Sequence, residues 1–463
     1  MIVYDCGGFL GERESAFFYR RNIMIFISKS IFLKRFKNEM LVVDTYLHNT
    51  FILNDIAADI VEYIYKKREV DISTILRQFE DIDDYEINTF LNELVALQIV
   101  FKQDDLSFKH GSNGNAPYKT DDIEADFQLN FIKEQKLYAA LVELTYRCNL
   151  RCSHCYAVES ESAKRELTTS DIINLFDELY DNGIFRLTLT GGEIFVRNDI
   201  LQIIEYAYKK GFLIDLFSNA TLLNEEIVKK LVDFHIRSFQ VSIYSHKPEI
   251  HDAITGIKGS FERSVNALRL LKKYHISTNI KSVMMERNFQ DYEGIEKLAN
   301  DLGASFQTSL YIIPHNNGSK ENLKNRIQNS RDIRNIIIQD LKRTKAISFY
   351  RKRSESDTIC NAGYSAISID PYGNIYPCNL LKIKLGNFKK EKISDIWTNS
   401  ELLNKIRQYR ISDLKQCSTC DKLEYCFFCP GAALAEKGNM LLPYEEACLI
   451  AGLKKDLDTK NMQ

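Results

Sequence analysis

The stretch "LYAALVELTYRCNLRCSHCY" (Leu137–Tyr156) joins an apolar run to a loop that carries three cysteines within eight residues. The apolar run has the length and continuity of a buried strand. Cys148, Cys152 and Cys155 follow it, separated by three and then two residues. A structural zinc site takes four ligands, so zinc would need a fourth group, for which His154 is the nearest candidate. Three thiolates can instead hold three irons of a [4Fe–4S] cube and leave the fourth iron open.

After this stretch, apolar runs of strand length alternate with amphipathic runs of helical period. The runs "RLTLT" (186–190) and "LIDLFSN" (213–219) are typical of strands, and "TSDIINLFDELYDNG" (169–183) is typical of a helix. About six such units predict an α/β fold with parallel strands, a partial (β/α)6 barrel of the TIM type. In such barrels the chemistry lies on the loops that follow the strands, which is where the three cysteines stand.

The chain divides by pattern into four regions. Strand-like runs and then three short helical runs come first, an order typical of a winged helix, and a polar stretch rich in Gly and Asn reads as a linker. Beyond about residue 345 the periodicity fades and cysteines predominate, which predicts a compact domain held by metal. The expected regions are a winged-helix domain at 1–108, a linker at 109–136, the barrel at 137–345 and a cysteine-rich domain at 346–463.

Composition restricts the possible partners and the compartment. The 463 residues carry a formal net charge of -2, which gives no electrostatic reason to bind nucleic acid. No apolar run approaches the roughly 18–20 residues that span a bilayer, and the first residues lack a secretory pattern, so we expect a cytoplasmic protein without a membrane partner. In that compartment the eleven cysteines are more readily metal ligands than disulfides, and the isolated Cys6 is an incidental thiol.

The motif "CNLRCSHC" followed by the aromatic Tyr156 resembles the radical S-adenosylmethionine (SAM) superfamily. Three further loops, each after an expected strand, resemble that family in order: "LTLTGGEIF" (187–195), "LFSNATLL" (216–223) and "VSIYSHKPEIHDAITGIKGSF" (241–261). The last of these has Thr255 where the family commonly has Arg. The resemblance implies that SAM binds the open iron, with cofactor contacts from Tyr156, Gly191, Gly192, Glu193, Ser218, Asn219 and Ser242.

The family's chemistry follows from that arrangement. An electron from the cluster cleaves SAM to methionine and a 5′-deoxyadenosyl radical, which removes a hydrogen atom from the substrate. A reducing partner such as flavodoxin or ferredoxin would supply the electron. His251 and Asp252 are expected to position their loop, because hydrogen-atom abstraction needs no general base. No residue is nominated as a catalytic acid or base.

Seven cysteines lie between residues 360 and 448, too many for one zinc ribbon and one short of two closed four-ligand sites. Their spacing resembles the SPASM extension of radical SAM enzymes, which implies two auxiliary iron–sulfur clusters and three clusters in all. Members with a complete first auxiliary site often carry a further cysteine just before it, whereas "RKRSESDTI" (351–359) has none, so an open iron could accept a substrate thiolate. The implied ligands are Cys360, Cys378 and Cys429 for the first cluster and Cys417, Cys420, Cys426 and Cys448 for the second.

The N-terminal region resembles the leader-peptide recognition element of peptide-modifying systems. In that element a leader peptide adds as a strand to a sheet edge and packs on the third helix, here between residues 49–53 and 85–97. Winged helices also bind DNA, but the third helical run, "YEINTFLNELVALQIV" (85–100), is acidic where a DNA-reading helix is basic.

The whole chain thus resembles maturases of ribosomally made peptides, most closely the subtilosin-maturase (sactipeptide, thioether synthase) type, with Ile194 where many relatives have Pro. This resemblance implies a bond between a cysteine sulfur and a carbon of a precursor peptide that binds through its leader. Carbon–carbon or carbon–oxygen crosslinking and epimerisation remain alternatives on the same scaffold. A sulfatase-type reaction is disfavoured by the leader-binding region, and an iron–sulfur regulator that binds DNA would have no use for the SAM loops.

Overall fold

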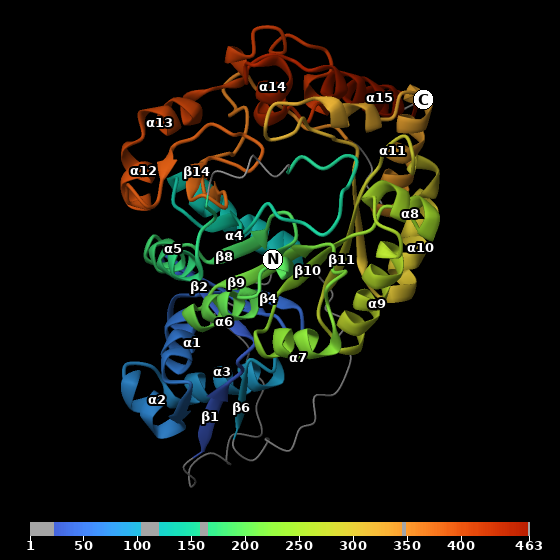
Figure 1. Ribbon diagram of the computed structural model, residues 1–463. Coiled ribbons are helices and arrows are strands. Elements are labelled where there is room, and N and C mark those ends of the chain that lie inside the picture. The colour runs from blue at the N-terminus through green and yellow to red at the C-terminus, as the bar shows by residue number, and fades with distance from the viewer. Residues whose placement is uncertain (1–22, 103–119, 158–164, 345–348, 462–463) are drawn as a thin grey trace. The chain divides into compact units, whose positions relative to one another are not determined.

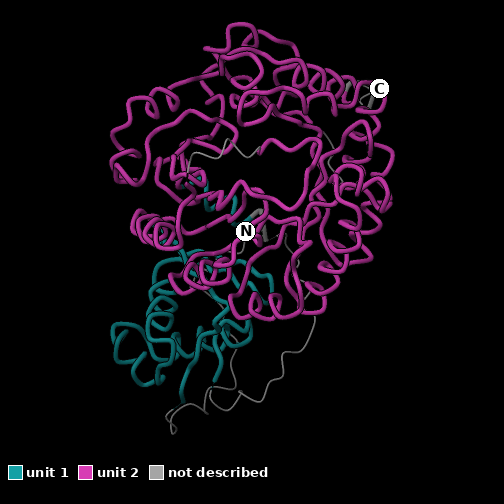
Figure 2. Tube along the Cα trace, viewed as in Figure 1, with its two compact units in different colours: residues 1–130 teal, residues 131–463 magenta. Residues whose placement is uncertain are grey.

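The computed structural model describes residues 23–102, 120–157, 165–344 and 349–461. The chain forms two compact units, residues 1–130 and residues 131–463 (Figure 2). Cys6 lies outside the described residues. Within the described ranges, no helix combines the length and the apolar character that a bilayer crossing requires.

The first unit contains two small antiparallel sheets and three helices. Strands β2 (Ile31–Phe36), β3 (Glu39–Asp44) and β4 (Asn49–Asn54) pair in the order β2-β3-β4. The second sheet has β1 (Met24–Ile27) between two short strands, β5 (Glu69–Asp71) and β6 (Val100–Lys102). The three helices are α1 (Asp55–Lys67), α2 (Ile72–Gln78) and α3 (Asp84–Ala96), and they lie where the helical period predicts them.

The region expected to be a linker is helical over half its length, because α4 spans Thr120–Glu134. Phe127 is buried and its ring packs edge-on against Phe36 at 6.5 Å between centroids. Phe131, one turn later, packs on Tyr138 at 5.0 Å. The polar composition of residues 109–119 suggested a linker, but the apolar spacing of the residues that follow is that of a packed helix.

Six parallel strands of the second unit form the partial barrel that the alternation of strands and helices predicts (Figure 1). Their order is β12-β11-β10-β9-β8-β7, and each pairs in parallel register with the next. The strands are β7 (Ala139–Glu143), β8 (Arg186–Thr190), β9 (Leu213–Ser218), β10 (Ser238–Ser242), β11 (Thr278–Val283) and β12 (Ser305–Ser309).

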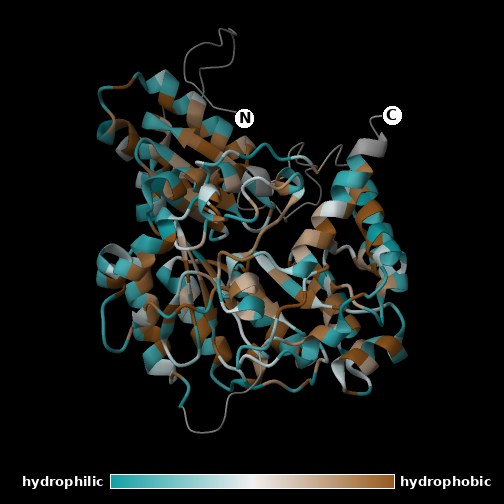
Figure 3. Cartoon of the chain, turned by 90° about the horizontal axis from the view of Figure 1, so that it is seen from above, coloured by the Kyte–Doolittle hydropathy of each residue, from teal (hydrophilic) through white to brown (hydrophobic). Residues whose placement is uncertain are grey.

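Helices follow the strands, as parallel crossovers require. Their apolar faces and the strands form one continuous core, and Figure 3 shows the strand segments largely apolar and the outer helix turns largely hydrophilic. The helices are α5 (Thr169–Asp181), α6 (Ile200–Lys210), α7 (Glu225–Asp233), α8 (Pro248–Thr255), α9 (Ser260–Lys273), α10 (Tyr292–Leu302) and α11 (Ser330–Thr344).

The cysteine-rich region continues the barrel sheet and is not a separate compact unit. Strand β13 (Ala366–Ile369) pairs in parallel with β7, and a hairpin adds β14 (Asn374–Tyr376) and β15 (Gly386–Asn387). The remaining helices are α12 (Ile393–Asn399), α13 (Glu401–Gln408), α14 (Pro430–Lys437) and α15 (Glu445–Asn461), of which α15 packs against α11 (Figure 1). This region has a hydrophobic core of its own, which includes Ile411, Leu414 and Tyr444 and against which several cysteines pack. The sequence predicted a domain held by metal, whereas apolar packing also supports it.

A buried carboxylate links three neighbouring barrel strands. Asp215 on β9 is 1% exposed and accepts from Arg186 of β8 at 2.7 Å and from Arg237, just before β10, at 2.8 Å. Burial by itself would raise the pKa of Asp215, but the two guanidinium groups outweigh it and hold the pKa below its usual range. The carboxylate is therefore ionised and satisfied inside the fold.

We predict that Asp215→Asn destabilises the barrel by about 3–5 kcal/mol, because breaking a buried pair leaves charged partners uncompensated. The matched control is Asp177→Asn, which removes a half-exposed pair with Lys210 and should cost about 1 kcal/mol or less. Thermal unfolding followed by circular dichroism at neutral pH measures both. Equal midpoints for the two variants would contradict the assigned role of Asp215.

Candidate active site

The three-cysteine loop leaves the carboxyl end of β7 and rests on the end of α8. Arg151 N donates to the Thr255 carbonyl at 2.8 Å and Ser153 N donates to the Ile254 carbonyl at 2.9 Å. The last carbonyls of a helix have no partner inside the helix, so they are available to fix a neighbouring loop. The segment around Thr255 thus supports the backbone of the cysteine loop. Thr255 itself is fully buried and bonds to Ser260 at 2.6 Å between their Oγ atoms.

The thiols of this loop are close enough to affect one another. Burial raises the pKa of Cys152, and the thiols of Cys155 and Cys148 raise it further. Burial also raises the pKa of Cys148 and of Cys155. Two donors face the sulfur of Cys148, the Leu150 amide at 3.4 Å and the Asn219 side-chain amide at 3.8 Å. Because a metal binds thiolates, loading this loop must release protons.

Glu193 joins two of the expected cofactor loops. Its carboxylate is fully buried and accepts from Ser218 Oγ at 2.8 Å, Asn219 N at 2.7 Å and Phe195 N at 3.0 Å. Burial raises the pKa of Glu193, while these three hydrogen bonds act in the opposite direction. The structure therefore brings Glu193, Ser218 and Asn219 together, and in this conformation the carboxylate holds the loops to each other.

The two glycines before Glu193 let its loop lie against the start of the cysteine loop. A Cβ on Gly191, whose φ is +141°, would stand 2.2 Å from the Thr145 carbonyl oxygen. A Cβ on Gly192 would stand 2.4 Å from the Arg147 carbonyl oxygen. That same Arg147 oxygen accepts from Glu193 N at 2.9 Å. The glycines therefore serve a close approach of two backbone segments, where the sequence predicted a close approach to a ligand.

Glu143, the last residue of β7, is a site residue that the sequence analysis missed. It is fully buried and accepts from the hydroxyls of Tyr146 and Tyr156, each at 2.9 Å. Lys382, four residues beyond Cys378, completes the group with an ion pair of 2.9 Å to the same carboxylate. In the sequence, the only sign of a role for Glu143 was its charge at the end of an otherwise apolar strand. The role becomes visible only when the cysteine-rich region folds back onto β7.

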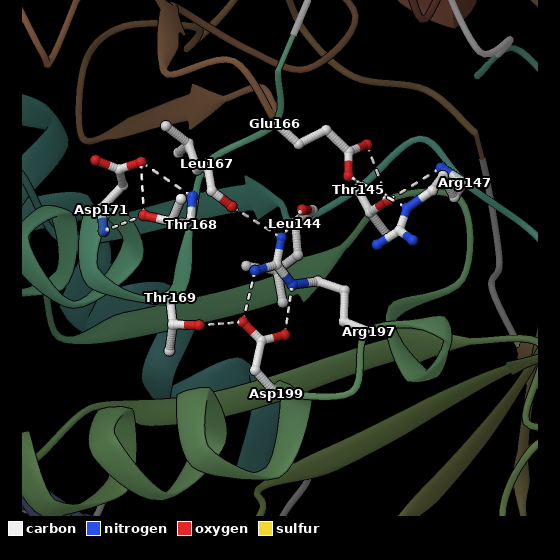
Figure 4. A network of polar contacts seen from close by, with 10 residues as sticks. All are labelled: Leu144, Thr145, Arg147, Glu166, Leu167, Thr168, Thr169, Asp171, Arg197 and Asp199. Carbon is white, nitrogen blue, oxygen red and sulfur yellow. Dashed lines mark hydrogen bonds and ion pairs between the residues drawn. The ribbon is translucent and has the colours of Figure 1, made fainter. Parts of the chain in front are cut away.

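A second polar network fixes the base of the cysteine loop (Figure 4). Arg197, 7% exposed, donates to the carbonyls of Leu144 and Leu167, each at 3.1 Å, and pairs with Asp199 at 2.7 Å. Glu166 accepts from Thr145 Oγ1 at 2.9 Å and from Tyr146 N at 2.8 Å. These contacts hold the residues between β7 and the first cysteine from both sides.

The histidines of the site are structural. His154 packs edge-on against Tyr244 at 4.6 Å between ring centroids, and burial lowers its pKa to about 4. His251 is fully buried, accepts from Tyr244 N at 3.2 Å, and has a pKa lowered by burial to about 4. Asp252 caps the start of α9 through Gly259 N and Phe261 N, so both residues position their loop as predicted. Ser242 ends β10, and its hydroxyl interacts with Tyr244.

The seven C-terminal cysteines fall into two electrostatically coupled sets. Burial raises the pKa of Cys360, and the nearby thiols of Cys378 and Cys429 raise it further. Burial raises the pKa of Cys426 to about 12, and the second set acts on it in the order Cys448, Cys417 and Cys420. The two sets coincide with the ligand sets implied by the SPASM resemblance.

Local backbone geometry suits the first of these sets to iron. Cys360 Sγ accepts from Ala362 N at 3.3 Å, and Cys429 Sγ accepts from Ala432 N at 3.5 Å. Cys429 is the N-cap of α14, where the helix dipole favours a thiolate. Amide donors to ligand sulfur are a usual feature of iron–sulfur sites. The thiols of the first set and the amides that donate to them therefore suit an iron–sulfur cluster.

Among the described residues, no three His, Cys, Asp or Glu side chains converge as ligands of a single metal ion would. A cubane does not demand such convergence, since each thiolate binds its own iron.

We predict that Gly192→Ala prevents stable iron binding at the three-cysteine loop, because the new methyl group displaces the Arg147 carbonyl next to Cys148. The control is Gly452→Ala in α15, where the nearest atom to a Cβ is Lys422 Cδ at an ordinary 3.8 Å. Iron content after anaerobic reconstitution, with the change of the cluster's EPR signal on adding SAM, measures the effect. If Gly192→Ala binds as much iron as wild type and shows the same EPR change on adding SAM, the close approach is dispensable.

Comparison with known proteins identifies both halves of the second unit. Residues 142–302 match the radical SAM superfamily, and residues 360–421 match SPASM, an iron–sulfur cluster-binding domain. An AdoMet-dependent heme synthase of Methanosarcina barkeri is 28% identical over 325 residues, which cover 65% of this chain and 93% of that protein. The antilisterial bacteriocin subtilosin biosynthesis protein AlbA of Bacillus subtilis is 28% identical over 302 residues, which cover 64% of this chain and 67% of AlbA.

Among solved structures, Streptococcus suis SuiB bound to the precursor peptide SuiA is similar with a TM-score of 0.58 and 16% identity. The similarity covers 92% of this chain and 99% of that chain. It shows a shared fold: a small N-terminal β domain, a partial barrel and a SPASM domain. The two matched domains identify this chain as a radical SAM enzyme that carries a SPASM domain and uses SAM and iron–sulfur clusters.

Proposed function

We propose that this enzyme matures a ribosomally made precursor peptide by joining a cysteine sulfur to a carbon of the same peptide. The observation that carries the proposal is the unequal number of thiols in the two C-terminal sets. The thiols of Cys378 and Cys429 raise the pKa of Cys360. Three other thiols, those of Cys448, Cys417 and Cys420, raise the pKa of Cys426. On the ligand sets proposed above, the first cluster has three protein thiolates, which would leave one iron for a substrate sulfur.

The site also supports the position of that iron near the SAM loops. Tyr156, which follows Cys155, interacts through its hydroxyl with Glu143 and with the side chain of Asn379, next to Cys378. Lys382 ties the same segment to Glu143. A substrate held at the first auxiliary site would therefore lie beside the loop that binds SAM. SAM contacts from Tyr156, Gly191, Gly192, Glu193, Ser218, Asn219 and Ser242 remain part of this proposal.

The proposed reaction balances as a two-electron oxidation of the peptide. SAM held at the three-cysteine loop would supply a carbon-centred radical, with one electron from the reducing partner. One C–H hydrogen atom leaves the peptide with 5′-deoxyadenosine, and the cysteine S–H loses its proton. One S–C bond forms, and the remaining electron passes to an auxiliary cluster. The product is two hydrogens lighter for each bond formed.

Three kinds of relative bear on the alternatives. The heme synthase match covers 65% of this chain, so about a third of the chain has no counterpart in it. The mycofactocin maturase and PqqA peptide cyclases, 25–27% identical, favour a peptide substrate with a different new bond. A peptide carbon–carbon crosslink is therefore the second candidate, and the shared fold with peptide-bound SuiB supports a peptide in either case.

The test is anaerobic incubation of the reconstituted enzyme with SAM, dithionite and the short cysteine-containing peptide encoded beside its gene. Tandem mass spectrometry should show a loss of two hydrogens per bond, with the affected cysteines blocked to alkylation. The same mass loss with every cysteine still alkylated would replace the thioether by a carbon–carbon or carbon–oxygen bond. An unchanged peptide mass, while SAM is still cleaved, would overturn the peptide assignment.

We further propose that the leader of this peptide adds to β4 of the first unit. Strand β4 pairs with β3 alone among the described strands, so its other edge forms no ladder with a described strand. Asp55 N donates to the Asn38 carbonyl on the β3 side, and donors alternate along a strand, so Ile52 N points to that other edge. The sequence predicted that α3 would lie beside β4 and complete the leader-binding groove. In the structure the principal contacts of α3 are with β6 instead.

Ile52→Pro should weaken leader binding at least tenfold, because it removes an outward donor and obstructs an added strand while sparing the bonds to β3. The matched control is Leu33→Pro on β2, the opposite edge, where the same alternation turns the amide outward. Fluorescence anisotropy with a labelled leader peptide measures the dissociation constants. Equal affinity for both variants would place the leader elsewhere.

A further inference from the structure

Two tyrosine hydroxyls near the auxiliary cysteines are buried without a protein partner among the described residues. Tyr311 lies two residues beyond β12, and Tyr444 immediately precedes α15. Tyr444 is 1% exposed, and the hydroxyl oxygens of both residues lack any hydrogen bond. Burying a hydroxyl without a partner destabilises a fold, so the presence of two such hydroxyls implies an acceptor that the polypeptide does not supply.

The surroundings of these hydroxyls point to sulfur. Tyr444 belongs to the hydrophobic core against which Cys360, Cys378, Cys426 and Cys429 pack, and its ring lies 6.2 Å from that of Phe428. The thiols of Cys429 and Cys426 act electrostatically on Tyr444, and those of Cys426 and Cys429 act on Tyr311. The two tyrosines therefore stand where the two auxiliary cysteine sets meet.

The charged groups beside the tyrosines are largely committed to one another. Arg326 pairs with Glu436 at 2.5 Å and with Glu446 at 3.0 Å, and it donates to the Ile312 carbonyl at 2.6 Å. One oxygen of Glu446 is buried without a partner, so Glu446 is the competing acceptor for either hydroxyl. Neither tyrosine hydroxyl makes a hydrogen bond to Glu446, or to a cysteine sulfur, in this structure.

We propose that Tyr444 donates a hydrogen bond to a sulfide of the first auxiliary cluster, on the side of Cys429, and that Tyr311 donates to a sulfide of the second, on the side of Cys426. This inference rests on the proposed ligand sets. Hydrogen bonds to cluster sulfur stabilise the more negative, reduced state and so raise the reduction potential. The two tyrosines are positioning residues that make the auxiliary clusters better electron acceptors, as the proposed reaction requires.

The test compares reconstituted full-length wild type with Tyr444→Phe, Tyr311→Phe and the control Tyr292→Phe. Tyr292 is equally buried, but its hydroxyl bonds to Asp340 at 3.1 Å and to Arg343, away from the cysteines. Potentiometric titration followed by EPR should show one auxiliary midpoint moved to more negative potential in each of the first two variants, and none moved in Tyr292→Phe. Iron content must match wild type in all four proteins.

Unchanged midpoints in Tyr444→Phe and Tyr311→Phe, or an equal shift in Tyr292→Phe, would overturn the inference. A measurement on wild type alone gives a second check, because a hydroxyl proton bonded to sulfur should appear in ENDOR spectra as an exchangeable coupling that disappears in D2O. Absence of that coupling would also overturn it. If wild type binds iron at the three-cysteine loop only, the assignment of the C-terminal cysteines as cluster ligands is wrong. That result would overturn this inference and the proposed function together.

Discussion

The central place of β7 in its sheet is the constraint on which the site depends. β7 pairs in parallel with β8 on one side and with β13 on the other, so the first barrel strand is enclosed by its own barrel and by the cysteine-rich region. The SAM-type cysteines leave the end of this strand. Since both neighbours are fixed by backbone hydrogen bonds, the two cysteine regions acquire a defined relation without a metal joining them.

Buried charge reinforces that relation. The carboxylate of Glu143 at the end of β7 is fully removed from water, and its two tyrosine donors and Lys382 supply the partners that such burial requires. Lys382 comes from the SPASM region and Tyr156 from the SAM loop. A single buried carboxylate thus holds together two parts of the chain that are more than two hundred residues apart in sequence.

The expected site loops occupy the ends of the strands to which they were assigned, because the strand period and the motif spacing are both local properties. The strand "RLTLT" is β8 without change of boundary, and α1 to α3 lie where their helical period predicted them. The linker interpretation failed over α4, because a polar stretch beside it masked the apolar spacing of Phe127 and Phe131. The glycines before Glu193, which the resemblance implies as cofactor contacts, lie against the backbone at the start of the cysteine loop.

By itself the sequence determined the fold class, the three-cysteine loop and the loops around Glu193, Asn219 and Ser242, since each depends on residues adjacent in the chain. Only the tertiary structure decided that β13 joins the barrel sheet and that Glu143 meets Lys382. These pairings join distant segments through burial and charge compensation. No local period or spacing encodes them, because their energies exist only once the segments are packed together.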